Sequence, residues 1–303
     1  MDEEEKADYS KISRKFKEVA DSNARLDLIK AIKLYSQGSK DESLKLLSSI
    51  IEEAPSIAAS MLYSPKSELA DEFSKLRFFS IFFAMLKSVK RYDAIVATIL
   101  FSFRDKKHYP IELVTTILPF MQDKEFISEF SSSLEEHPRE LLQFLVDSEE
   151  QEFVKPFRKF IKDYIEENFG DDQYTAIKAI SLIKDSATER FLLGYIDDWD
   201  EEVRRLVLLY FMNSQSHEIG SEFVNALISE KDRRLRALLK HIIMNNFSRL
   251  KDHIIKEIKK NKLEASKDLL HVAFMMMDKK ELSELADELS DEKRNYLLNK
   301  MYI

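Results

Sequence analysis

Cysteine is absent from the chain, and glycine and proline are scarce. The 303 residues include no Cys, 4 Gly and 6 Pro, whereas an average glycine content of about 7% would give about twenty glycines in this length. Glycine loops that hold phosphates, tight hairpins and glycine-bent barrels therefore lack the residue they require. The absence of cysteine excludes disulfides, thiolate nucleophiles and cysteine-ligated zinc or iron–sulfur centres.

Long hydrophobic runs and a secretory leader are also missing. The longest apolar stretches, at 78–86 and 94–103, have about half of the ~18 residues that a membrane-spanning helix needs. The first ten residues are acidic and have neither the basic nor the apolar part of a signal peptide. We therefore expect a soluble intracellular protein, cytoplasmic or nuclear, that does not associate with membranes.

The residues that are abundant favour helices. Hydrophobic residues make up 44% of the chain and charged residues 34%, with a net charge of −8. Apolar residues recur at helical spacing nearly throughout, and alternation with period two is scarce. Asp172 and Asp200 stand where they would cap the helices that follow them, and a helix pair is expected at 24–36 and 41–53. The sequence predicts an all-α protein.

Apolar anchors recur in the second half of the chain at intervals of 31 or 32 residues. The first anchors are Phe160, Phe191, Phe223, Ile254 and Leu285. A second apolar helix is expected after each of them. A lone helix pair cannot bury its apolar face, so stacked pairs would form one continuous core. The alternative is a helical bundle whose similar helix lengths imitate a period.

Two segments, 197–211 and 231–243, resemble HEAT-type repeats. In each, an acidic turn leads into a helix that opens with Val-Arg or Leu-Arg and continues apolar. The resemblance implies a right-handed α-solenoid of antiparallel helix pairs. The period of about 31 residues is shorter than the ~40–47 residues of ordinary HEAT and armadillo units, which resembles the short variants. It also implies a ladder of bonds between adjacent repeats, formed by the matching residues Asp200, Arg204, Asp232 and Arg236.

The resemblance covers only part of the chain. We expect residues 150–303 to form HEAT-like helix pairs that end in a capping pair, and residues 1–149 to form an irregular, divergent helical part of the same solenoid.

No pattern in the sequence points to catalysis. The six histidines lack metal-binding spacing, and there is one His-Glu dipeptide, His217-Glu218, where the HEAT-repeat deoxyhypusine hydroxylases have several. The nucleophile elbow and the phosphate-binding loop are both missing. Trp199, the single tryptophan, lies between Asp198 and Asp200, unlike the several tryptophans of the HEAT-like DNA glycosylases. We expect no enzymatic activity, no cofactor and no metal.

Charge provides the positive signal. Residues 231–262 carry eleven basic and three acidic side chains, a net charge of +8. We define the basic stripe as five residues at matching or neighbouring positions of the second helices, namely Arg204, Arg233, Arg236, Lys240 and Lys267. Such a stripe can bind an acidic peptide or a phosphate backbone.

The predicted function is that of a non-enzymatic scaffold or adaptor. Its curved solenoid surface would bind a protein partner with an acidic surface through the basic stripe. The alternative is a nucleic-acid or ribonucleoprotein-associated protein that uses the basic residues of 231–262 on phosphates. A structural role for Arg204 and Arg236 in the ladder also remains open, as does the oligomeric state.

Overall fold

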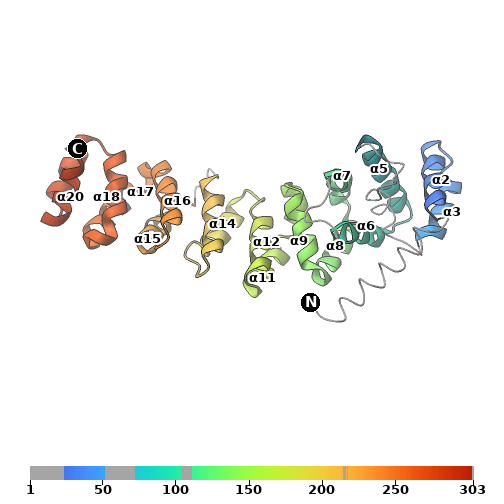
Figure 1. Ribbon diagram of the computed structural model, residues 1–303, viewed down its shortest axis with the longest axis horizontal. Coiled ribbons are helices and arrows are strands. Elements are labelled where there is room, and N and C mark those ends of the chain that lie inside the picture. The colour runs from blue at the N-terminus through green and yellow to red at the C-terminus, as the bar shows by residue number, and fades with distance from the viewer. Residues whose placement is uncertain (1–23, 52–71, 104–110, 214–215, 217, 302–303) are drawn as a thin grey trace. The chain divides into compact units, whose positions relative to one another are not determined.

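The computed structural model describes residues 24–51, 72–103, 111–213, 216 and 218–301. These residues form α-helices and short 3-10 turns with no strand among them (Figure 1), so the prediction of an all-α chain is confirmed for the described part. No helix in this part has the length and apolarity needed to cross a membrane.

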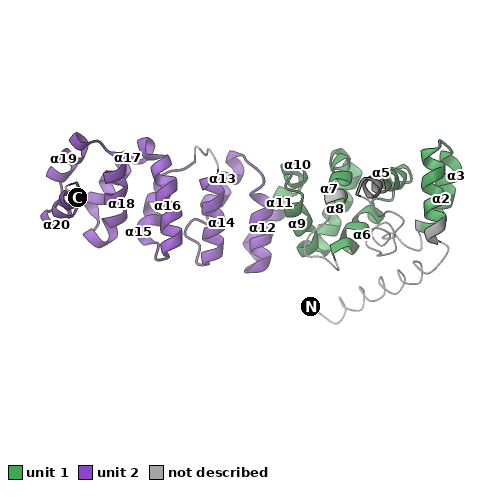
Figure 2. Ribbon diagram, turned by 45° about the horizontal axis from the view of Figure 1, so that its top comes forward, with its two compact units in different colours: residues 1–160 green, residues 161–303 purple. Residues whose placement is uncertain are grey.

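The chain divides into two compact units, residues 1–160 and 161–303 (Figure 2). The division falls inside the helix α11 (Arg158–Glu167). The expected domains, 1–149 and 150–303, remain a prediction, and the two units are described separately below.

Unit 1 contains the helix pair that was expected near its start. Helix α2 (Ala24–Ser36) contacts α3 (Lys40–Ile51), in agreement with the pair predicted at 24–36 and 41–53, of which residues 52–53 lie outside the described part. The unit continues with α5 (Glu72–Ser88), α6 (Tyr92–Phe103), α7 (Ile111–Ile117), η1 (Leu118–Gln122), α8 (Lys124–Glu136), α9 (Pro138–Asp147), α10 (Gln151–Val154) and η2 (Lys155–Phe157).

A chain of phenylalanine rings fills the core of unit 1 between α8, α9, α10 and η2. The ring centroid of Phe130 lies 5.9 Å from that of Phe126, 6.1 Å from that of Phe144 and 4.8 Å from that of Phe157. Phe144 contacts Phe153 edge-on at 5.8 Å. All five side chains are buried, and such tilted or edge-on pairs add to the free energy of burial.

Unit 2 consists of helices joined by short turns. They are α11, α12 (Asp171–Ile180), α13 (Ser186–Leu193), α14 (Glu201–Met212), α15 (Ser221–Ser229), α16 (Arg233–Asn245), α17 (Phe247–Lys260), α18 (Leu263–Met276), α19 (Lys279–Asp287) and α20 (Asp291–Met301). A helix therefore lies at each position where the apolar anchors predict one.

The second helices of unit 2 contact one another in chain order. Helix α12 contacts α14, α14 contacts α16, α16 contacts α18, and α18 contacts α20. Of the first anchors, Phe223, Ile254 and Leu285 are buried, whereas Phe160 and Phe191 are half-buried and the residues that follow them, Ile161 and Leu192, are buried. The core of unit 2 thus runs along successive helix pairs.

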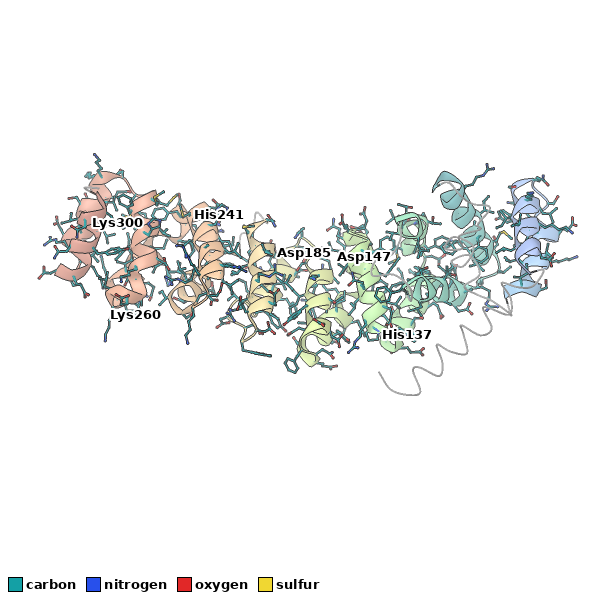
Figure 3. The ribbon with its side chains drawn as sticks, viewed as in Figure 1. His137, Asp147, Asp185, His241, Lys260 and Lys300 are labelled. Atoms are coloured by element: carbon teal, nitrogen blue, oxygen red, sulfur yellow. The ribbon has the colours of Figure 1, made fainter. Side chains whose placement is uncertain are left out.

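Side-chain caps set where several of these helices begin. Asp200 accepts a hydrogen bond from the backbone N–H of Glu202 (2.8 Å), which confirms the predicted cap of α14. Asp185, labelled in Figure 3, caps α13 in the same way through the N–H of Thr188 (2.9 Å). The prediction for Asp172 was wrong, because the N-cap of α12 is Gly170, two residues earlier, and Asp172 lies inside the helix.

Candidate partner-binding surface

The basic stripe lies on three helices that contact each other in order. Arg204 is on α14, Arg233, Arg236 and Lys240 are on α16, and Lys267 is on α18. The structure thus places the predicted residues on neighbouring second helices. Four of the five, however, are held in ion pairs within the chain.

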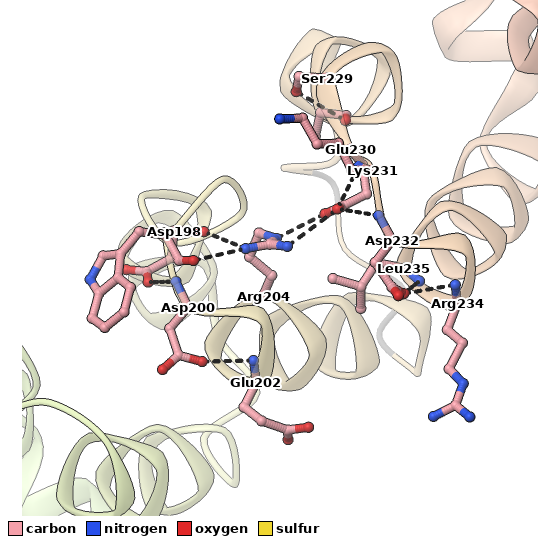
Figure 4. Close-up of polar contacts among 12 residues, drawn as sticks. Asp198, Asp200, Glu202, Arg204, Ser229, Glu230, Lys231, Asp232, Arg234 and Leu235 are labelled. Carbon is pink, nitrogen blue, oxygen red and sulfur yellow. Dashed lines mark hydrogen bonds and ion pairs between the residues drawn. The ribbon is translucent and has the colours of Figure 1, made fainter.

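Arg204 forms a bidentate ion pair with Glu230, which lies just after α15 (Figure 4). Its Nε lies 2.8 Å from Glu230 Oε2 and its Nη2 lies 3.2 Å from Oε1. Its Nη1 donates to the backbone carbonyl oxygens of Asp198 (2.8 Å) and Trp199 (3.3 Å). The Arg204 side chain is 16% exposed and that of Glu230 is 7% exposed. Arg204 therefore joins the turns that precede α14 and α16.

Glu230 is stabilised as a carboxylate by four hydrogen bonds. Besides the two from Arg204, its Oε1 accepts from the backbone N–H groups of Lys231 (2.8 Å) and Asp232 (2.9 Å). Burial by itself would raise the pKa of Glu230, but these hydrogen bonds outweigh burial and hold the pKa below its ordinary value. The charge of Arg204 is therefore neutralised inside the chain.

Arg236 and Lys240 share one carboxylate on the next second helix. Arg236 Nε lies 2.7 Å from Asp268 Oδ2, with a further close contact from its Nη2, and Lys240 Nζ lies 3.2 Å from Oδ1. Asp268 is on α18. Burial would raise the pKa of Asp268, but the two cations hold the pKa below its ordinary value. The pair connects α16 to α18.

The remaining two stripe residues differ from each other. Lys267 Nζ lies 2.5 Å from Oε1 of Glu264, which is one turn earlier on the same helix. Arg233, the first residue of α16, is exposed and forms no ion pair with any described residue. Arg234 beside it and Lys231 before it are exposed in the same way. The free positive charge therefore gathers at the N-terminal end of α16 rather than along the stripe.

The structure also shows the bonds of the four residues at the ladder positions. Arg204 and Arg236 reach carboxylates of the following helix pair, as described. Asp200 accepts a hydrogen bond from the Tyr174 hydroxyl of α12 at 2.5 Å. Asp232 bonds to the N–H groups of Arg234 (2.7 Å) and Leu235 (2.9 Å) at the start of its own helix. The acceptors of the two arginines are thus Glu230 and Asp268, which the sequence reasoning did not single out.

A signal for one of these acceptors was present in the sequence. Asp268 follows Arg236 by 32 residues, which is one period of the apolar anchors, and a contact between neighbouring pairs would be expected at that distance. Glu230 follows Arg204 by 26 residues, and that spacing gives no such signal.

The described residues contain no group of three or more His, Asp or Glu side chains placed to hold a metal ion. The labelled histidines of Figure 3 lie at unrelated positions in the two units, His137 at the start of α9 and His241 exposed on α16. The Nε2 of His241 lies 3.1 Å from the side-chain amide of Asn245. Comparison of the chain with protein-family models, with curated proteins and with solved structures found no match in any of the three.

Proposed function

We propose that this protein is a non-enzymatic interaction scaffold or adaptor, and that residues 161–303 form a HEAT-like, right-handed α-solenoid of short helix pairs. The observation that carries the proposal is the order of contacts in unit 2, where each second helix from α12 to α20 contacts the next one. Such an arrangement gives an extended surface composed of many successive helices, which suits the binding of another protein.

The partner surface that fits best is acidic, and its contact centres on Arg233. Four cations of the basic stripe already have carboxylate partners in the chain, so a partner would gain little from them. Arg233, Arg234 and Lys231 have none among the residues that the structure describes. They lie at the N-terminal end of a 13-residue helix, whose dipole adds to the positive potential there.

The proposal is tested by affinity purification from a native lysate, with and without nuclease. The wild-type protein is compared with Arg233→Glu and with Lys279→Glu. Lys279 is a matched control, because it is an exposed lysine at the start of α19 that forms no ion pair with a described residue. The expected result is a set of proteins that survives nuclease, is lost with Arg233→Glu and is retained with Lys279→Glu. Equal recovery by both variants would remove Arg233 from the proposal.

Nucleic acid remains the alternative ligand of the same end of α16. Several phosphate contacts would make the affinity fall steeply with salt, and nuclease would then remove every captured protein. The net charge of −8 opposes the approach of phosphate and favours the protein partner.

A further inference from the structure

Two large aromatic side chains lie exposed and in contact on unit 2. Phe169 is 65% exposed and Trp199 is 74% exposed. Their ring centroids are 6.4 Å apart and the ring planes are inclined by 55°. Phe169 precedes α12 and Trp199 precedes α14. Most phenylalanine and tryptophan side chains are largely buried, so an exposed pair on neighbouring turns requires an explanation.

Both rings lie on turns with a specific backbone conformation or specific hydrogen bonds. Gly170, which follows Phe169, has φ 65° and ψ −138°, a conformation that other residues rarely adopt. On the other turn, Arg204 donates to the carbonyl oxygens of Asp198 and Trp199, and Asp198 Oδ1 accepts from the N–H of Asp200 at 2.8 Å. Both rings thus belong to internal turns of unit 2, and the turn at Trp199 is held by hydrogen bonds to its backbone.

The surroundings of the two rings are acidic. Residues 166–172 carry four carboxylates and residues 197–202 carry five, and neither segment contains a cation. Asp171, Asp197 and Glu201 are exposed and form no ion pair with any described residue. We call the two rings together with the carboxylates of these two segments the acidic aromatic patch.

The carboxylates of the two segments converge on Tyr174. Its hydroxyl donates to Asp200, and this hydrogen bond is the main reason why the pKa of Tyr174 rises to about 12. The negative charges of Glu202 and Asp171 raise it further. Asp171 belongs to one segment and Asp200 to the other. Carboxylates of both segments therefore lie near the Tyr174 hydroxyl.

The negative region reaches Tyr195 and ends at a neighbouring cavity. Burial raises the pKa of Tyr195, and the charges of Glu166 and Asp198, one from each segment, add to it. Asp197 and Asp198 also line a cavity of about 280 Å³ beside the same turn, together with Glu230 and the cations Arg204 and Lys231. On the side toward α15 the carboxylates of the patch therefore meet the cations Arg204 and Lys231, and the negative region ends there.

We propose that the acidic aromatic patch is a docking site for a basic, arginine-containing segment of a partner protein. A guanidinium group stacks on the face of one of the two rings, Phe169 or Trp199, and pairs with the carboxylates around them. Arginine combines a planar cation with a weak hydration shell, so it suits an aromatic face bordered by carboxylates. The patch is opposite in charge to the end of α16, and Arg233 is not among the residues that line the cavity beside the patch, so that a variant of Arg233 tests the other surface separately.

The chain offers a direct reporter, because Trp199 is its only tryptophan. The experiment titrates the full-length protein with a short synthetic peptide of alternating arginine and glycine, and follows the tryptophan emission. The expected result is a saturable change with the arginine peptide, a weaker one when lysine replaces arginine, and none when glutamate replaces it. Added salt should weaken the binding.

Two variants measure the contributions of the rings and of the carboxylates to peptide binding separately. Phe169→Ala leaves the reporter in place and should weaken the binding about two- to fivefold, the range of an exposed cation–π contact. Asp171→Asn with Asp197→Asn should also weaken it by about two- to fivefold. The matched controls are Met275→Ala, at another exposed apolar side chain of unit 2 (55% exposed), and Asp252→Asn with Asp291→Asn, at exposed acidic residues. Both controls should bind like the wild type.

Four results would overturn the proposal. One is the absence of a saturable response, and another is a response to the glutamate peptide of equal strength. The third is unchanged affinity in both patch variants. The fourth is a concentration-dependent emission change in the protein alone, with self-association that Phe169→Ala abolishes, since this would assign the patch to a second copy of the chain. Arg233→Glu should bind the arginine peptide at least as well as the wild type. A negative result in the affinity purification with this variant would therefore leave the peptide titration unaffected, and the two proposals can fail separately.

Discussion

Replacing Arg204 by methionine tests how much the ion pair with Glu230 contributes to the stability of unit 2. The substitution keeps much of the side-chain volume and removes the hydrogen bonds that Arg204 donates to Glu230 and to the carbonyls of Asp198 and Trp199. Breaking a fully buried pair costs about 3–5 kcal/mol. Arg204 is 16% exposed, and Glu230 keeps two backbone N–H donors. We therefore expect the free energy of unfolding to fall by about 2–3 kcal/mol.

The neighbouring residue provides a matched control. Arg205 also pairs with a glutamate, Glu202, but both side chains are more than 40% exposed. Arg205→Met should therefore lower the free energy of unfolding by less than about 0.5 kcal/mol. Urea unfolding is followed by far-UV circular dichroism and by the emission of Trp199, which lies in unit 2. If Arg204→Met costs no more than Arg205→Met, the pair with Glu230 is not the structural link inferred here.

Two further predictions follow from the contacts of unit 2. The pKa of Glu230 is held below its ordinary value of 4.5, so its stabilising contribution is present above that pH and is lost as the pH falls through the lower pKa of the folded state. The stability difference between the wild type and Arg204→Met should therefore shrink when urea unfolding is repeated below pH 4.5, and a constant difference would contradict the pKa assignment. The ammonium group of Lys293, a buried residue, donates to the carbonyl oxygens of Ile258 (2.7 Å) and Lys259 (3.1 Å). Lys293→Met should lower the free energy of unfolding by about 1–2 kcal/mol and speed amide hydrogen exchange in α20, whereas unchanged exchange would show that this link does not hold the helix.

The positions of the helices followed from local chemistry. Apolar spacing near 3.6 residues identifies a helix wherever one face is buried, and for this reason the anchors from Phe160 to Leu285 fall on helices, from α11 to α19. Asp200 was a reliable cap because an aspartate that precedes a helix accepts hydrogen bonds from its first N–H groups. The same reasoning missed the start of α12, because Gly170 takes a left-handed conformation that no periodicity reveals.

The pairing of surface charges was harder to predict, because it depends on contacts between residues of different helices and turns. The spacing of the basic stripe was visible in the sequence, but the carboxylates that neutralise Arg204 and Arg236 come from residues 26 and 32 positions further on. Three consecutive residues of a helix cannot all point inward, and of the methionines at 275–277, Met275 and Met276 are exposed whereas Met277 is buried.

The sequence by itself determined that the described part of the chain is helical, where the helices of unit 2 lie, and that disulfides and cysteine-ligated metals are excluded. These properties depend on composition and on residues within a few positions of each other. Only the tertiary structure decided which cations remain free and that Phe169 and Trp199 stand exposed together between acidic turns. Ion pairing and exposure depend on distances between residues far apart in the chain, and these distances are set by the packing of one helix against the next.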